Sequence, residues 1–175
     1  MCKVIIIGGM AAGCKTAARL SRLSSDYEIT VIEQGPVISF GNCGLPLYAS
    51  GELDNINDLA KTAYGKIRDV DYFRDFKGIT ALTDTEVTNI DLNKLKVKCK
   101  NVTNNETIDL QYNKLVFATG SKAIKPQFPF PKSSNVSSFL SAQDAKIFRE
   151  AVQKGKVDKA VVIGGGFIGC ELVEA

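Results

Sequence analysis

The chain has 175 residues, of which 45% are hydrophobic and 23% charged, and its net charge at pH 7 is only +3. This composition is typical of one globular domain, or of one domain with a fragment of another. A net charge this small does not indicate nucleic-acid binding, so any anion site must come from local placement of lysine and arginine. The sequence has no histidine, which removes the commonest general base and metal ligand, and we expect no metal site.

The sequence opens on an apolar segment that lacks the pattern of a signal peptide, and no apolar run approaches the ~20 residues needed to span a bilayer. The five cysteines are widely scattered and include no CxxC pair, which fits a reducing compartment better than a disulfide scaffold. We therefore expect a cytoplasmic protein without nucleic-acid or membrane partners.

Apolar periodicity and turn residues predict an α/β fold. In chain order we expect strands over Val4–Ile7, Glu28–Glu33, Glu86–Asp91, Lys96–Lys100, Thr107–Gln111, Lys114–Thr119 and Ala160–Ile163, and helices over Ala11–Leu23, Leu45–Ser50, Asp69–Phe76 and Ala142–Lys154. The first strand, helix and strand form a βαβ unit, whose crossover is almost always right-handed. The three short strands between residues 86 and 111 are typical of an antiparallel meander.

The second half of the chain predicts a linker followed by the start of another unit. Prolines and serines over Lys125–Ser138 indicate the linker. The apolar run Ala160–Ile163 then enters a second glycine-rich turn, and the sequence ends one or two helical turns later. We expect a first domain over residues 1–124, a linker and helix over 125–158, and the truncated start of a second domain over 159–175.

The first glycine-rich turn is a candidate dinucleotide site. Gly8 allows a tight turn, Gly13 allows close packing of helix on strand, and the helix N-terminus offers free N–H groups to a pyrophosphate. Met10 stands where a full GxGxxG motif has glycine. The run alone is also compatible with a packing device. Glu33, at the end of the second strand, is placed to bind ribose hydroxyls and favours the dinucleotide interpretation.

The second glycine-rich turn, Gly164–Gly169, is a full GxGxxG motif after an apolar run. The alternative is a glycine-rich turn between domains. The acidic residue that would bind its ribose lies beyond Ala175, so the sequence does not distinguish NADH from NADPH.

Cys43 is the candidate redox residue. Gly41, Asn42 and Gly44 leave its sulfur approachable, and Pro46 favours a helix starting nearby, where the thiolate form of a cysteine is stabilised. Because no second cysteine lies close in sequence, a redox role needs a mixed disulfide with a small thiol, or a sulfenic acid. The commoner role of a free cysteine is that of a small buried hydrophobe, which we expect for Cys2, Cys14, Cys99 and Cys170.

Lys15, Arg19 and Arg22 are spaced so that they share one face of the first predicted helix. A solvated basic face is the ordinary interpretation of such a pattern. The alternative is a patch for a phosphate-bearing substrate near Cys43, which Lys77 could join.

Five segments together resemble the N-terminal part of the flavin-dependent pyridine nucleotide–disulfide oxidoreductases, in the branch with a single redox cysteine, and above all the coenzyme A-disulfide reductases. The segments are Ile5–Gly13 (IIIGGMAAG), Val31–Gly35 (VIEQG), Ile38–Pro46 (ISFGNCGLP), Leu115–Ser121 (LVFATGS) and Val161–Glu171 (VVIGGGFIGCE). They follow the family's order across essentially the whole chain. The resemblance implies a Rossmann-like FAD-binding domain with a parallel sheet and an antiparallel meander, followed by the start of an NAD(P)-binding Rossmann unit.

The resemblance also implies roles for individual residues. Cys43 is the expected catalytic nucleophile. FAD is expected at Gly8, Gly9, Met10, Ala11, Ala12, Gly13, Glu33, Gln34, Val87, Ala118, Thr119 and Gly120. NAD(P)H is expected at Gly164, Gly166, Phe167, Ile168, Gly169 and Glu171. Coenzyme A is expected at Lys15, Arg19, Arg22, Ser39, Asn42 and Lys77.

In the implied reaction a nicotinamide cofactor reduces FAD, FAD reduces a mixed disulfide between Cys43 and coenzyme A, and the coenzyme A thiol leaves. Related NADH oxidases and peroxidases carry histidine where this chain has Ala11, and serine where it has Asn42, so both residues favour thiol–disulfide exchange. An oxidase or peroxidase, a polysulfide or persulfide reductase, and a non-catalytic flavin-fold module remain alternatives.

The family's nicotinamide domain, second flavin-domain segment and dimerisation domain are absent from the sequence. We therefore expect a homodimer for the full-length protein, and little or no catalysis from this chain alone, because hydride delivery needs the nicotinamide domain.

Overall fold

A computed structural model of the chain describes residues 1–124 and 135–175. They form two compact units, one made of Met1–Phe40 and Ala60–Gly120, the other of Gly41–Leu59 and Ser121–Ala175. Much of the predicted linker, residues 125–134, lies outside the described residues. None of the described helices is long and apolar enough to cross a membrane.

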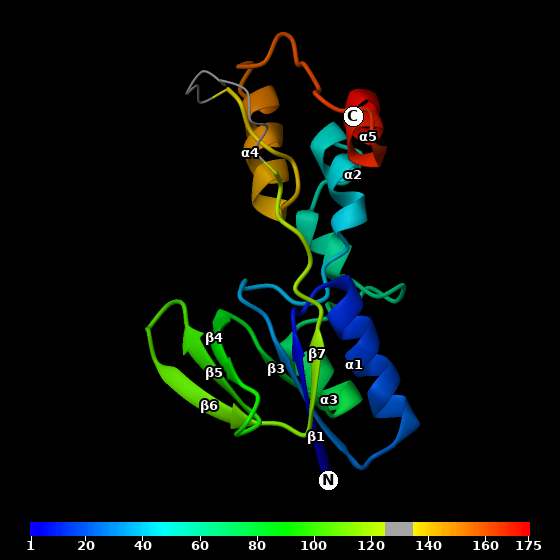
Figure 1. Ribbon diagram of the computed structural model, residues 1–175. Helices are drawn as coiled ribbons and strands as arrows, with labels where there is room; N and C mark the ends of the chain where they lie inside the picture. The colour runs from blue at the N-terminus through cyan, green and yellow to red at the C-terminus, as the bar shows by residue number, and fades with distance from the viewer. Residues whose placement is uncertain (125–134) are drawn as a thin grey trace. The chain divides into compact units, whose positions relative to one another are not determined.

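The first unit is built on a four-stranded parallel sheet with the order β3-β2-β1-β7 (Figure 1). Its strands are β1 (Cys2–Ile7), β2 (Tyr27–Ile32), β3 (Thr80–Leu82) and β7 (Lys114–Phe117). Helix α1 (Ala11–Leu23) connects β1 to β2 and completes the predicted βαβ unit. The sequence did not predict β3, because three residues are too few to show a period.

Alternation along β1 divides the core of this unit between the two faces of the sheet. Val4 and Ile6 face a cluster that includes Ala17 of α1 and Phe73 of α3 (Val70–Lys77). Ile5 points to the opposite face. Successive strand residues point to opposite faces, so a fully apolar strand is required when both faces are covered. This explains the unbroken apolar run at the start of the sequence.

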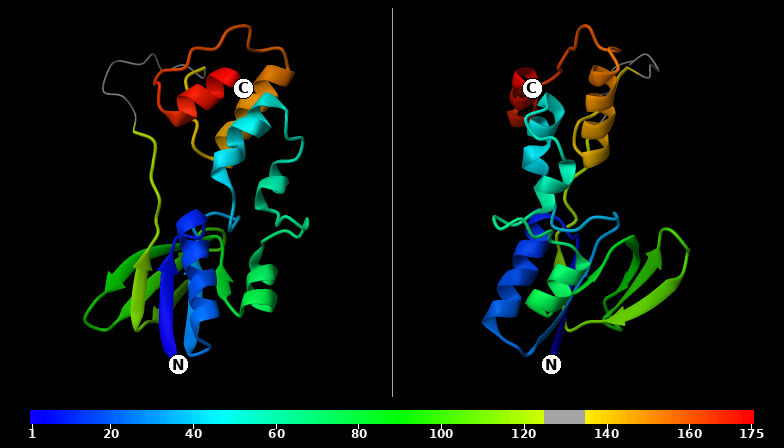
Figure 2. Two further views of the ribbon diagram at one scale, coloured as in Figure 1. Left: turned by 90° about the vertical axis from the view of Figure 1, so that its right-hand side faces the viewer. Right: turned by 180° about the vertical axis from the view of Figure 1, so that it is seen from behind.

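The predicted antiparallel meander covers the second face. It consists of β4 (Thr85–Asp91), β5 (Lys96–Asn101) and β6 (Thr107–Gln111), in that order. Val97 and Cys99 are fully buried and pack in the same cluster as Ile5. The views in Figure 2 show the meander on one side of the parallel sheet and α1 and α3 on the other. The predicted α/β fold class is confirmed.

The second unit is helical within its described residues. The short 3-10 turn η1 (Asn42–Gly44) leads into α2 (Leu45–Ser50). A second 3-10 helix, η2 (Ile56–Ala60), ends at Ala60, the residue at which the chain returns to the first unit. Helix α4 (Ala142–Gln153) packs on α2, and α5 (Phe167–Glu174) contacts α2 as well. Ser141 and Asp144 form a capping box that fixes the start of α4.

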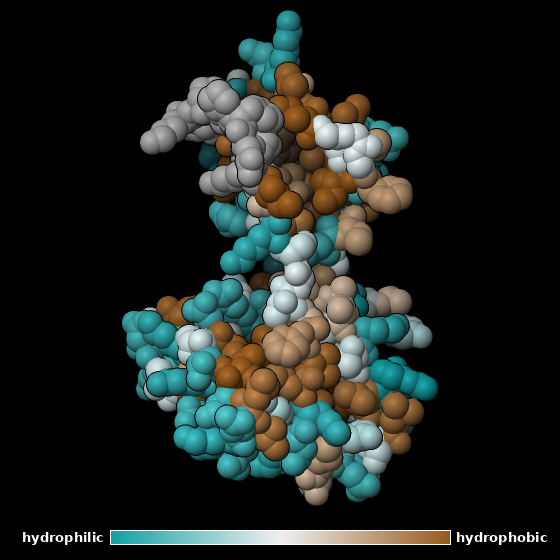
Figure 3. Space-filling view, in the orientation of Figure 1, coloured by the Kyte–Doolittle hydropathy of each residue, from teal (hydrophilic) through white to brown (hydrophobic). Residues whose placement is uncertain are grey.

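The strand predicted over Ala160–Ile163 is wrong. These residues have no strand structure, and the side chains of Val161 and Ile163 are 86% and 69% exposed. A strand is defined by hydrogen bonds to a neighbour, and the described part of this unit contains no strand to pair with. Figure 3 shows apolar side chains at the surface of the part of the molecule that holds α2, α4 and α5.

Candidate functional site

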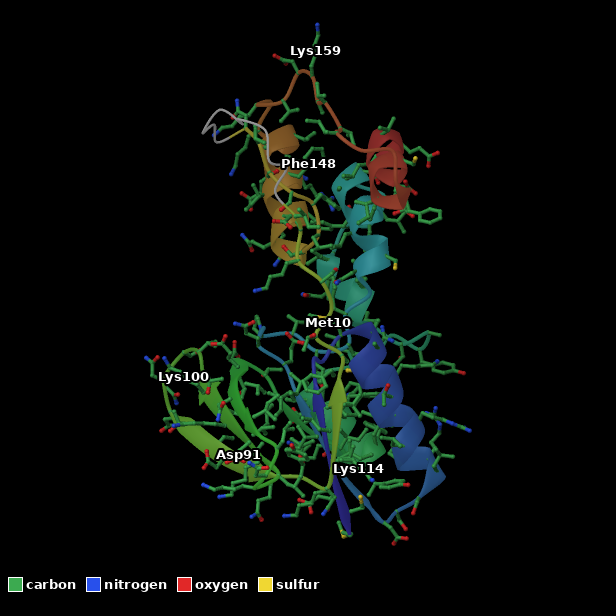
Figure 4. All side chains as sticks on the ribbon, in the orientation of Figure 1. Met10, Asp91, Lys100, Lys114, Phe148 and Lys159 are labelled. Atoms are coloured by element: carbon green, nitrogen blue, oxygen red, sulfur yellow. The ribbon has the colours of Figure 1, made fainter. Side chains whose placement is uncertain are left out.

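The first glycine turn forms an open cradle at the N-terminal end of α1, where Figure 4 labels Met10. Gly8 has a φ of +106°, and Gly13 passes so close to the Gly8 carbonyl that any Cβ would overlap it. The first amide to bond back into the helix is that of Cys14, which donates to the Met10 carbonyl at 3.1 Å. The earlier N–H groups are therefore not used by the helix, and in the described chain Met10 supplies no side-chain cap. These features fit a pyrophosphate.

Glu33 closes one side of this cradle. Its carboxylate accepts hydrogen bonds from the N–H of Gly9 at 2.7 Å and from the N–H of Gly35 at 2.9 Å. A Cβ at Gly9 would lie 2.8 Å from the Cβ of Glu33, so only glycine permits this approach. Each carboxylate oxygen keeps a further lone pair, which suits it to accept from ribose hydroxyls. Gln34 beside it is exposed.

The second predicted flavin turn lies directly against the first. The Ala118 N–H donates to the Ile7 carbonyl at 2.8 Å, and a Cβ on Gly8 would overlap the Ala118 carbonyl. Thr119 and Gly120 follow on the surface. Val87 instead packs against the core cluster between the sheets. The structure therefore brings Gly8–Gly13, Glu33 and Ala118 together, as a single dinucleotide site requires.

A buried polar cluster next to the cradle was not predicted. The Ser39 N–H donates to the Gly9 carbonyl at 2.7 Å, and the Cys14 thiol donates to the same oxygen at 2.9 Å. Burial raises the pKa of the Cys14 thiol to about 11, partly offset by hydrogen bonds from Ser39. Ser39 has a φ of +57°, which is uncommon for a residue other than glycine and is often found at functional sites.

Cys43 lies in the turn η1, and its side chain is exposed. The Gly41 N–H donates to the Leu59 carbonyl at 3.0 Å, and a Cβ on Gly44 would overlap the Leu59 side chain. The flanking glycines are therefore packing requirements as well as a means of leaving the sulfur accessible. Leu59 was not predicted as a support. Asn42, expected to contact coenzyme A, is also exposed.

The basic residues predicted to bind a phosphorylated substrate lie on the surface of the first unit. Lys15, Arg19 and Arg22 are exposed on α1. Lys77, at the end of α3, has its ammonium 5.7 Å from the centroid of the Tyr72 ring. The helical spacing thus places the first three on one face, and a role for them in substrate binding stays a prediction.

The second glycine turn repeats the local geometry of the first. Gly164 has a φ of +118°, and a Cβ on Gly169 would overlap the Gly164 carbonyl. Gly166 begins α5 without a side-chain cap in the described chain. Phe167 is 93% exposed and Ile168 46%. The turn conformation is therefore present, whereas within residues 1–124 and 135–175 no sheet surrounds it. Glu171 is exposed on α5.

The burial expected for four cysteines is correct for two of them. Cys14 and Cys99 are buried, and desolvation raises the pKa of Cys99 to about 11 as well. Cys2 is only partly buried, and Cys170 is exposed, so the prediction for Cys170 is wrong. Cys170 follows Gly169 as Cys14 follows Gly13, but among the described residues no sheet covers the face of α5 that carries it.

A separate cleft lies at the other end of β1. It has a volume of about 310 Å³ and is lined by Lys3, Val4, Ile5, Glu28, Thr30, Lys96, Asp109, Leu110 and Gln111. None of the predicted site residues lines it. Dinucleotides bind at the carboxyl ends of parallel strands, so this cleft lies at the wrong end of β1 for that purpose.

Comparison with known proteins agrees with the geometry. Residues 2–175 match the profile of the pyridine nucleotide-disulphide oxidoreductases. The chain belongs to this family. The predicted resemblance is thereby confirmed, and the relatives in this family are flavin oxidoreductases that use FAD and NAD(P)H.

Individual relatives differ in their named activities. The chain is 32% identical over 173 residues to an NADH oxidase of Lactococcus lactis subsp. cremoris, covering 99% of this chain and 37% of that protein. It is 29% identical over 174 residues to a coenzyme A disulfide reductase of Staphylococcus haemolyticus, covering 99% and 38%. The structure of an NAD-dependent persulfide reductase from A. fulgidus matches with a TM-score of 0.92 and 41% identity, covering 98% and 31%. The chain therefore spans only 31% to 38% of the length of these relatives.

Proposed function

We propose that this chain carries the flavin and thiol half of an NAD(P)H-dependent oxidoreductase that reduces a small disulfide of the coenzyme A disulfide type through Cys43. The observation that carries the proposal is the exposed thiol of Cys43 in a turn held by Leu59, in a chain that also contains the glycine cradle at the start of α1. The relatives named as coenzyme A disulfide reductases support the substrate class.

The residues of the cradle fit FAD. The free N–H groups at the start of α1 would hold the pyrophosphate, Glu33 the ribose, and the turn at Ala118 would lie beside them. When bound, FAD would pass two electrons from NAD(P)H to sulfur. The second glycine turn, Gly164–Gly169, is the proposed beginning of the NAD(P)H site.

Cys43 would act as the nucleophile. Its thiolate attacks one sulfur of the disulfide RSSR, so that a Cys43–S–S–R bond forms and RS⁻ leaves. Two electrons then break the mixed disulfide, regenerating the Cys43 thiolate and releasing a second RS⁻. Both RS⁻ groups take protons, so the sum is RSSR + NAD(P)H + H⁺ → 2 RSH + NAD(P)⁺. Lys15, Arg19 and Arg22 would bind the phosphates of R, with Ser39, Asn42 and Lys77 as further contacts.

The thiol chemistry can be tested on this chain directly. The purified chain is incubated with coenzyme A disulfide, and its intact mass is recorded before and after a mild reductant. We expect an added mass of one coenzyme A that reductant removes and that Cys43→Ser abolishes. Absorbance near 450 nm after incubation with FAD reports whether the cradle binds flavin.

Cys170→Ser is the matched control, because Cys170 is the other cysteine with an exposed side chain. It should leave the adduct in place. An adduct that survives Cys43→Ser, or the absence of any adduct, would refute the proposed role of Cys43. A chain that never binds flavin would refute the role of the cradle separately.

A persulfide or polysulfide substrate is the second candidate. The 41% identity to a persulfide reductase favours it. The same Cys43 chemistry applied to RSS⁻ yields RSH and sulfide. Sulfide release from a coenzyme A persulfide, measured against reduction of coenzyme A disulfide by the full-length protein, distinguishes the two substrates.

The wider assignments remain proposals too. We propose that residues 1–124 belong to the FAD-binding domain, 125–158 to a linker and helix, and 159–175 to the NAD(P)-binding domain. All five cysteines are free thiols, which supports a cytoplasmic location. We propose a homodimer for the full-length protein, which the sedimentation coefficient of that protein would test.

A further inference from the structure

We propose that Arg149 is a positioning residue for Cys43: its guanidinium holds the C-terminal end of α2 and thereby fixes the turn that presents the thiol. The inference rests on the proposed function only for the redox role of Cys43. The geometry itself lies entirely within the second unit.

Arg149 is a nearly buried cation. Its side chain is only 13% exposed, and its guanidinium lies over the Tyr48 ring, with the Cζ atom 4.5 Å from the ring centroid. It occurs one helical turn after Ala145, which is fully buried, so it belongs to the stripe of α4 that packs on the rest of the unit. A charged side chain in such a position needs several polar partners.

The partners are mainly backbone carbonyls at the end of α2. The Nη1 group donates to the Tyr48 carbonyl at 3.2 Å and also to the Leu53 carbonyl. The ion pair with Asp54, at 3.4 Å, contributes less, because the Asp54 side chain is 98% exposed. A guanidinium is suited to this task because its planar fork donates several hydrogen bonds at once and stacks on an aromatic ring.

Arg149 therefore joins two pieces of backbone. The last turn of α2 ends at Gly51, which has a φ of +91° and donates to the Tyr48 carbonyl at 3.3 Å. The chain then turns back, and the Leu53 N–H donates to the Leu47 carbonyl at 3.0 Å. By donating to the carbonyls of both Tyr48 and Leu53, the guanidinium holds the segment after Gly51 against α2. Its positive charge also complements the negative C-terminal end of the α2 dipole.

The constraint reaches Cys43 through a helix only six residues long. Gly44 is the N-cap of α2, and Leu45 at its start is 2% exposed. On the other side, the turn of Cys43 is held by Leu59 through Gly41 and Gly44. The thiol thus lies between two anchored points. A helix this short is not stable alone, so its order depends on packing and on Arg149.

The test compares Arg149→Met and Arg149→Lys with the unaltered chain. Iodoacetamide labelling is followed at each cysteine by peptide mass spectrometry, and the rate at Cys43 is divided by the rate at Cys170, an exposed thiol of the same unit. We expect Arg149→Met to lower this ratio about threefold to tenfold, because the carbonyls it leaves unpaired loosen α2, and the turn before this helix then no longer holds the Cys43 thiol in its exposed position. Arg149→Lys, which keeps a donor, should recover part of the loss.

Two variants serve as controls. Lys154→Met removes an exposed cation at the C-cap of α4, whose ion pair among the described residues is with Glu150 of that helix, so it should leave the ratio unchanged. Asp54→Asn removes the ion pair but leaves every backbone carbonyl bound, and it should also have little effect. Hydrogen exchange of α4 shows whether the second unit is folded in each variant. If Arg149→Met does not fold, the positioning role is judged from Arg149→Lys alone, by whether its ratio of labelling rates at Cys43 and Cys170 differs from that of the unaltered chain.

The outcomes separate this inference from the proposed function. An unchanged ratio in folded Arg149→Met and Arg149→Lys would overturn the positioning role. So would an equal change at Cys43 and Cys170, since that indicates only general loosening of the unit. The coenzyme A adduct in the unaltered chain tests the function of Cys43 independently. Its absence would refute that function even if the labelling ratio responds to Arg149.

Discussion

The two glycine turns of this chain have nearly the same local conformation and very different surroundings. Gly8 and Gly164 both have a strongly positive φ, and Gly13 and Gly169 each approach the carbonyl of the glycine five residues earlier. The first turn follows a strand of a four-stranded sheet and packs against Ala118. The second follows an exposed, unpaired segment. Local sequence is therefore sufficient for the turn, whereas the strand that precedes it requires a partner.

The cysteine that follows each glycine turn shows the same contrast in surroundings. The Cys14 thiol is buried and donates to the Gly9 carbonyl at 2.9 Å, while the Cys170 thiol is exposed and lies 3.7 Å from the Gly165 carbonyl. Equivalent positions in a repeated motif thus differ in chemical environment. The chain therefore offers matched pairs of substitutions in which only the surroundings vary.

Substitution of the first glycine of each turn should give the largest difference in lost stability between the two turns. Gly164→Ala introduces backbone strain alone, about 1–3 kcal/mol, because nothing lies within 4 Å of its Cβ. Gly8→Ala adds overlap with the Ala118 carbonyl, and we expect it to destabilise the first unit by at least about 4 kcal/mol. Urea denaturation of both variants measures the difference. Equal losses would show that the surroundings of Gly8 do not matter.

Truncation of the preceding apolar residues is expected to give the next largest contrast. Ile5→Ala removes a side chain that is 2% exposed and should cost about 2–5 kcal/mol. Val161→Ala, at the equivalent place in the repeat, removes one that is 86% exposed and should change stability by less than about 0.5 kcal/mol. Circular dichroism during denaturation follows both. A large loss from Val161→Ala would mean that this segment is packed after all.

The Cys14 thiol should make the first unit sensitive to alkali. Burial raises its pKa from an ordinary 9.0 to about 11, so the folded state keeps a proton that the unfolded state has lost. Stability from this group is complete below pH 9 and falls as the pH rises towards 11, by at most about 3 kcal/mol. The free energy of unfolding is measured from pH 8 to 11.

Cys14→Ala provides the reference for that measurement, because titration of other groups is common to both proteins. The stability of the unaltered chain relative to Cys14→Ala should decline over this range. A constant difference would contradict the effect of burial. Cys170→Ala, which alters the exposed counterpart, should leave stability near neutral pH within about 0.5 kcal/mol.

Among the changes proposed in the first unit, neutralising Glu33 should have the smallest effect on stability. Glu33→Gln keeps an acceptor for one of the two glycine N–H groups but loses charge-assisted bonds, at a cost of about 1 kcal/mol. If the cradle binds FAD as proposed, its affinity should fall about tenfold, which corresponds to about 1.4 kcal/mol. Flavin fluorescence titration measures this. Undiminished FAD affinity would exclude a ribose contact by Glu33.

Much of the first unit could be predicted because its sequence periods are strong. The apolar run of β1, the helix after Gly8 and the alternation of lysine with Val97 and Cys99 in β5 each specify an element and its buried face. The cradle residues Gly8, Gly13 and Glu33 were predicted from spacing, and the structure brings them together. Strand β3 was missed because three residues carry too little pattern.

The second unit shows where prediction from sequence failed. An apolar run before a glycine turn predicted a strand at Ala160–Ile163, yet no described strand lies beside it. Cys170 was expected to be buried because a free cysteine is most often a small buried hydrophobe. The role of Arg149 also escaped notice, although an arginine on the buried stripe of a predicted helix was a usable signal. Its partners, Tyr48 and Leu53, are about a hundred residues away in sequence.

By itself, the sequence determined the helices, the turns and the residue types at the candidate site, because backbone sterics and short-range periodicity act within a few residues. Only the tertiary structure decided which apolar segment becomes a strand, which thiol is buried and which cation supports the turn of Cys43. Strand pairing, desolvation and the hydrogen bonds of a buried guanidinium all need partners from distant parts of the chain, and such pairings leave no local pattern.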